Sequence, residues 1–87
     1  MGDDTEMTRL ARLAAMQMEE PGRAEAATPG SFGCHEALDR TFLLMDMLGN
    51  WLLEHPAIIS DEDWFRLADE AHTKLMDMYQ AIGAKHL

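Results

Sequence analysis

The sequence predicts an all-α fold built on an antiparallel pair of long helices, with a third, loosely tethered helix at the N-terminus. Apolar residues recur at helical spacing over residues 34–55 and again over residues 61–82. The connection between these segments is short, which makes the two helices antiparallel neighbours. The length of 87 residues and the apolar fraction of 47% are typical of one globular domain. We therefore expect a single helical domain over residues 1–87.

The charge balance limits the classes of partner. Seven basic and sixteen acidic residues give a formal net charge of −9. A field of this sign repels phosphate, so we expect no nucleic-acid binding and no docking on anionic membranes. The N-terminal segment MGDDTEMTRL lacks the pattern of a signal peptide, and no run approaches the roughly 18 apolar residues that span a membrane. These features, with Cys34 as the only cysteine, favour a cytoplasmic protein without a disulfide of its own.

The first helix is predicted over about residues 4–20. Met7, Leu10, Ala14 and Met18 lie on one stripe, which is thin and rich in alanine. Pro21 and Gly22 end this helix. The linker of residues 21–33 contains two breaks of the Pro-Gly type, so we expect no regular element in it.

The second helix, residues 34–55, is apolar over about twice the arc of roughly 100° that a surface helix needs. An advance of about 100° per residue divides its apolar side chains into two adjoining faces. The first face consists of Cys34, Leu38, Thr41, Phe42, Met45, Leu48, Gly49 and Leu52. The second face consists of Ala37, Leu44, Met47 and Trp51. Two faces require two packing partners.

The third helix is predicted over residues 61–82, after a short link at residues 56–59. Ser60 is the expected N-cap, with Ile59 and Trp64 at the spacing of a hydrophobic staple. Gly83 is expected to loosen the end of the helix and to leave residues 84–87 frayed.

The short link also predicts which residues of the two long helices lie side by side. Residues whose numbers sum to about 115 should be neighbours. This register places Leu48 beside Leu67 and Thr41 beside Leu75. Gly49 should then let Trp64 or Ala68 approach closely.

The third helix covers one face of the second helix and leaves the other uncovered. The first helix offers mainly alanine and methionine to a face that contains Trp51, which favours a second copy of the hairpin as the cover. The predicted function is therefore a small acidic protein–protein interaction module, homodimeric in the manner of a four-helix bundle. The residues expected to form the interface are Arg40, Leu44, Met47 and Trp51.

A second hypothesis is an acidic inhibitor or adaptor that binds a basic protein partner. It would use the same surface or a set of carboxylates that mimics phosphate. This set consists of Asp39, Asp46, Glu54, Asp61, Glu62 and Asp63. A charge run of this density is more often a solvated face.

A third hypothesis is a small helical bundle that binds a divalent metal. His35 and Asp39 lie one helical turn apart, and His86 comes near His35 in an antiparallel hairpin. The sequence contains no HExxH or CxxC motif, so we expect no metal ion and no other cofactor.

We expect no enzymatic activity. Cys34 and His35 are adjacent and point about 100° apart on a helix, so the histidine is badly placed as a base for the thiol. His72 is expected as a half-buried, hydrogen-bonded residue near Leu43 and Leu44. The Met-x-Met pair found in each helix is expected to fill the core.

Overall fold

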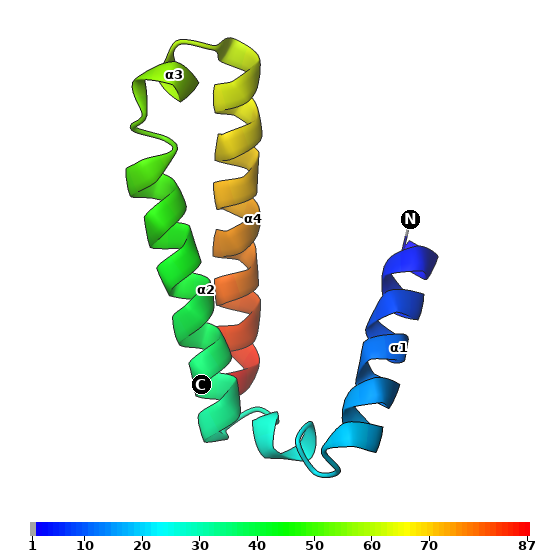
Figure 1. Cartoon of the computed structure of the whole chain (residues 1–87). Helices are drawn as coiled ribbons and strands as arrows, with labels where there is room; N and C mark the ends of the chain where they lie inside the picture. Colours follow the sequence, from blue (N-terminus) through cyan, green and yellow to red (C-terminus); the bar gives the residue numbers. More distant parts are fainter. Residues whose placement is uncertain (1) are drawn as a thin grey trace.

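The computed structural model describes residues 2–87 as helices joined by turns, without a β-strand among them (Figure 1). The three long helices are α1 (Gly2–Glu19), α2 (Phe32–Trp51) and α4 (Glu62–His86). Two short elements, the 3₁₀ helix η1 (Glu25–Ala27) and helix α3 (Pro56–Ile59), lie in the connections. Helices α2 and α4 run antiparallel side by side, whereas α1 stands apart at the far end of the linker. The all-α prediction and the antiparallel hairpin are confirmed.

Helix α2 begins two residues before the predicted start and ends four residues before the predicted end. The Ser31 hydroxyl accepts a hydrogen bond from the Cys34 backbone N–H (3.1 Å) and caps the first turn. At the other end, the backbone N–H groups of Leu52 and Leu53 both donate to the Leu48 carbonyl, at 3.0 and 3.1 Å. The helical hydrogen-bond pattern is lost there, so the predicted extension to residue 55 is wrong.

The predicted link at residues 56–59 is the short helix α3. Pro56 occupies its first turn, where backbone N–H groups have no acceptor within the helix, so the missing N–H of proline costs no hydrogen bond. The His55 ring caps this helix by accepting a hydrogen bond from the Ala57 N–H through Nδ1 (3.1 Å). Asp61, rather than Ser60, caps α4, because its Oδ1 accepts from the Trp64 N–H (3.0 Å). The predicted Ser60 cap is wrong, and the staple built on it loses its basis.

Helix α4 continues through Gly83 to His86, so the predicted end at residue 82 and the frayed tail are wrong. The last turn is held by contacts with distant parts of the chain. The Gly30 backbone N–H donates to Nδ1 of His86 (2.8 Å), and the rings of His86 and His35 lie 5.4 Å apart between centroids. These contacts bring together the linker, the start of α2 and the end of α4.

The register of α2 against α4 differs from the predicted one. Phe42 packs against Tyr79 with ring centroids 5.8 Å apart, whereas the predicted register places it beside Thr73. Gly49 lies against His72 and not against Trp64 or Ala68. The reason is that α3 lengthens the connection, so the chain passes beyond the end of α2 before it turns back, and the first turns of α4 pack on α3.

This register gives a stability prediction for Gly49→Ala. A Cβ atom at Gly49 would lie 3.4 Å from Nε2 of His72, an ordinary van der Waals distance, and the φ angle of Gly49 is not positive. Alanine loses less backbone entropy than glycine when a helix forms. We expect the free energy of unfolding, measured with urea at one fixed protein concentration, to rise by about 0.5–1 kcal/mol.

Gly30→Ala is the matched control, because Gly30 has a φ of +89° that a Cβ atom makes unfavourable. This variant should lower the free energy of unfolding by about 1–2 kcal/mol. A loss of stability in Gly49→Ala of the same size would mean that a bulkier group than His72 faces Gly49, and would contradict the register.

The core of the hairpin is small. Among the described residues, the buried apolar ones are Leu38 and Ala68, joined by Thr41, whose hydroxyl donates to the Ala37 carbonyl (2.9 Å). The radius of gyration is 16.1 Å, against about 12 Å for a compact chain of this length. Within residues 2–87, α1 contacts no other helix, and none of the helices is both long and apolar enough to cross a membrane.

The linker of residues 21–33 was predicted to lack regular structure, and this is wrong at residues 25–27, which form η1, and from Phe32, where α2 begins. Helix η1 packs against the start of α2. The contact is close at Gly33, where a Cβ atom would lie 3.0 Å from both Cα and Cβ of Ala27. Glycine at this position is what allows the linker to lie on the helix.

Candidate protein-interaction surface

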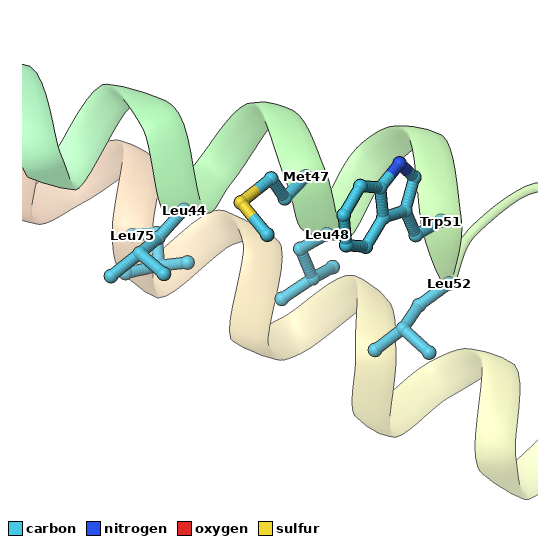
Figure 2. A pocket seen from close by; sticks show the side chains of 6 residues that line it. All are labelled: Leu44, Met47, Leu48, Trp51, Leu52 and Leu75. Carbon is cyan, nitrogen blue, oxygen red and sulfur yellow. The ribbon is translucent and has the colours of Figure 1, made fainter.

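An apolar groove runs along the C-terminal half of α2 and opens to solvent (Figure 2). Its volume is about 340 Å³. It is lined by Leu44, Met47, Leu48, Trp51, Leu52 and Leu75. The first four project from α2, Leu52 follows directly after its last residue, and Leu75 projects from α4 beside Leu44. Every lining side chain is aliphatic, aromatic or a thioether, so the groove suits another apolar surface rather than a polar ligand.

Three of the four predicted interface residues line this groove. Leu44, Met47 and Trp51 belong to it, and 67% of the Trp51 surface is exposed. A tryptophan left this open is unusual, because its large apolar area favours burial.

Arg40, the fourth predicted interface residue, is not among the lining side chains. It lies at the surface of α2, and its Nη2 atom is 3.5 Å from Oε1 of Glu36. Both side chains are at least half exposed, and an ion pair of this kind contributes little to stability. Arg40 therefore remains able to change partner when another surface covers the groove.

The prediction missed three groove residues, Leu48, Leu52 and Leu75. Leu48 and Leu52 were assigned to the seam between the two helices, and they lie at its edge, where they also reach the groove. Leu75 was missed because the predicted register placed it beside Thr41.

The apolar surface extends from the groove over α4. Leu67 and Met78 are 65% and 53% exposed, and an advance of about 100° per residue places both on the side of α4 that adjoins Leu75. We call the groove together with Leu67 and Met78 the open face. Contiguous exposed apolar side chains on two neighbouring helices mark an interaction surface.

Four of the six carboxylates of the predicted acidic surface make local contacts. Asp61 caps α4, while Glu62 and Asp63 both pair with Arg66, at 3.4 and 3.3 Å. Asp39 lies beside His35. The six carboxylates therefore do not form one free strip, although most of their side chains are exposed.

At the end of the hairpin where α2 begins and α4 ends, four residues form a chain of contacts that we call the histidine chain. Its members are Gly30, His86, His35 and Asp39. The Gly30 N–H donates to Nδ1 of His86 (2.8 Å), and Nε2 of His86 lies 3.4 Å from Nδ1 of His35. Nε2 of His35 lies 3.6 Å from Oδ2 of Asp39. The structure thus brings together the three residues considered for a metal site.

The hydrogen bonds of the histidine chain decide which nitrogens carry protons. Because Nδ1 of His86 accepts from Gly30, the proton of the neutral ring is on Nε2 and points toward His35. Nδ1 of His35 then accepts, and the proton of that ring faces Asp39. A metal ion would need the lone pair of Nε2 on His86, which this arrangement does not offer.

Across residues 2–87, no group of three or more histidine, cysteine, aspartate or glutamate side chains is arranged to hold a metal ion. The arrangement favours a hydrogen-bonded tether between the linker, α2 and α4 over a metal centre.

The tautomer of His86 can be tested by nitrogen-15 NMR of the imidazole rings in neutral to alkaline solution. We expect the His86 spectrum to show a protonated Nε2 and an unprotonated Nδ1. His55 serves as an internal reference, because its Nδ1 also accepts a backbone hydrogen bond, from Ala57. A protonated Nδ1 on His86 would contradict the Gly30 contact and reopen the metal interpretation.

The remaining candidate residues have structural surroundings. Cys34 is half-buried in the first turn of α2. His72 is half-buried and lies over Gly49, which replaces the predicted position near Leu43 and Leu44. Met78 is exposed on the open face, so at least one methionine is not core filler in the single chain.

Comparison of the chain with protein-family models, with curated proteins and with solved structures finds no match.

Proposed function

We propose that this chain is a homodimeric helical protein–protein interaction module. The open faces of two hairpins pack against each other and form a four-helix bundle. The observation that supports the proposal is the apolar groove lined by the exposed Trp51, with the exposed Leu67 and Met78 on the adjoining side of α4. In a symmetric dimer the same patch serves both copies, so one self-complementary surface is enough.

The exposed area is large enough for a stable dimer. The chain exposes 6898 Å², whereas a compact protein of 9.8 kDa exposes about 5,200 Å². The excess is about 1,700 Å² per chain. A standard protein interface removes about 800 Å² from each partner. A second copy would bury that much and leave further area for α1.

Stability also favours a partner. Leu38 and Ala68 are the buried apolar residues of a hairpin that orders more than half of the chain. A pair of helices with so small a core rarely reaches useful stability alone. Burying the open face would increase the free energy of unfolding by about 25 cal/mol for each Å² of apolar area removed from water. Folding and association should therefore be coupled.

Sedimentation equilibrium of the full chain tests the proposal. We expect a mass near twice 9.8 kDa at tens of micromolar protein, and an unfolding midpoint that rises with protein concentration. A monomer of 9.8 kDa with a midpoint independent of concentration would overturn the proposal.

Salt dependence gives a second prediction. Each copy carries a net charge of −9, so charge repulsion opposes association and is screened by salt. We expect the dimer dissociation constant to fall as sodium chloride is raised from about 0.05 to about 0.5 M. Isothermal dilution calorimetry at several salt concentrations measures this change.

The same measurement separates the dimer from the competing function as an acidic adaptor. Binding of a basic protein to this negative chain would weaken with added salt, because the opposite charges are screened. A dimer that dissociates as salt is added would contradict an interface based on apolar packing.

A further inference from the structure

We infer that α1 is an exchanged arm, which packs in the dimer on the α2 helix of the other copy, along the side that carries Leu43 and Met47. This inference rests on the proposed dimer and names the second contact that each copy makes.

Helix α1 does not pack against another helix in the described part of the chain. Along residues 2–87 it contacts none of the other elements, and Met7, Leu10 and Met18 are exposed. Most of the stability of a helix in a protein comes from packing its apolar side against another element, and the 18-residue α1 has no such contact here. It therefore needs a surface to cover its apolar stripe.

The linker fixes the point from which α1 leaves the hairpin. Helix η1 packs on the start of α2, and the Gly30 N–H is bound by His86. The turn after α1 is also hydrogen bonded: the Glu20 N–H donates to Met16 O (2.8 Å) and the Ala26 N–H to Gly22 O (3.1 Å). Residues 20–30 are therefore an ordered connection and not a flexible linker, and we call them the bracket.

The bracket directs α1 away from its own hairpin. Gly22 has a φ of +91°, which turns the chain sharply at the end of α1. Figure 1 shows α1 returning along the general direction of the hairpin without meeting it. To reach its own α2, α1 would have to change direction at this turn, whereas a second copy can cover α1 where it stands.

The apolar pattern of α1 fits a helix that docks on another helix. Met7, Leu10, Ala11, Ala14 and Met18 follow the spacing i, i+3, i+4, i+7 and i+11. This is the anchor pattern by which an amphipathic helix binds an apolar helical surface. The 18 residues of α1 span about 27 Å, close to the length of about 30 Å of the 20-residue α2.

Helix α2 offers a matching side that the hairpin leaves uncovered. Leu43 is 55% exposed, although it stands among polar residues of α2, and Met47 adjoins it one turn later. An advance of about 100° per residue places Leu43 to one side of the groove, with Met47 between them. Two hairpins that meet over the groove would leave this side at the edge, where an arm of the second copy can lie.

Paramagnetic relaxation in mixed dimers tests the exchange. All chains carry Cys34→Ser, so that a spin label attaches only at Arg12→Cys, an exposed position of α1 that lies about 140° around the helix from Met7 and off the apolar stripe. Labelled chains without nitrogen-15 are mixed with unlabelled chains that contain it. We expect a loss of amide signal intensity around Leu43 and Met47 in the nitrogen-15 chain, which the label reaches only across the dimer.

The matched experiment places label and nitrogen-15 in the same chain and dilutes it with plain chains. Signal loss on α2 in this sample, and none in the mixed dimer, would overturn the exchange and leave the proposed dimer intact. Loss in neither sample, with a dimeric mass, would also overturn it. A monomeric mass would overturn both proposals.

Discussion

Trp51→Glu is expected to convert the dimer into a monomer, with self-association weakened by about 100-fold or more. Trp51 lines the groove and is 67% exposed in the single chain, so it is the largest apolar side chain that a partner can cover there. Tryptophan residues at the centre of an interface contribute about 2–4 kcal/mol or more when truncated. A symmetric dimer loses this contact twice and gains two carboxylates in an apolar contact.

Gln80→Glu is the matched control for added charge. Gln80 is exposed on α4 and lies about 140° around the helix from Leu75 and about 160° from Met78. The substitution adds the same charge to each copy outside the open face. Sedimentation of both variants at several concentrations should give a monomer for Trp51→Glu and a dimer for Gln80→Glu. Equal dissociation of the two would mean that net charge, and not the groove, controls association.

The sequence was sufficient to predict the helical pair and the exposed second face of α2. Both depend on periodicity within one segment, and the apolar pattern of Leu44, Met47 and Trp51 is visible without knowledge of the partner. The predicted approach of His86 to His35 is also found in the structure. These features follow from helical spacing and from the antiparallel order alone.

The register and the helix ends were not predictable in the same way. Four residues, Pro56–Ile59, form a helix where a plain link was expected, and this shifts α4 along α2. The shift moves Leu75 from the side of Thr41 into the groove beside Leu44. The apolar periodicity within each helix is the same before and after such a shift, so periodicity does not indicate which residues of α2 and α4 lie side by side.

The end of α4 shows a related limit. Gly83 favours termination by its local conformational freedom, and the prediction used that preference. The helix continues because His86 is bound by Gly30 and contacts His35, residues more than 50 positions away. Local propensity was overridden by tertiary contacts that a single segment does not reveal.

Leu38→Ala is expected to lower the free energy of unfolding by about 2–5 kcal/mol, the range for a leucine truncated in a core. Leu38 is only 4% exposed, and the other buried apolar residue, Ala68, has no side chain long enough to fill the cavity left behind. Native proteins have a free energy of unfolding of about 5–15 kcal/mol, so a loss of this size is a large fraction of the total. Urea unfolding should therefore show a large loss of folded protein under conditions where the wild type is stable.

Leu87→Ala is the matched control, since it makes the same truncation at a residue that is 89% exposed, and it should change the free energy of unfolding by less than about 0.5 kcal/mol. The comparison also separates folding from association. Leu38 faces α4 and lies outside the open face, so the unfolding midpoint of Leu38→Ala should still rise with protein concentration. Trp51→Glu should abolish that rise. If Leu38→Ala removed it as well, the dimer would depend on the seam between α2 and α4, and the open face would lose its assigned role.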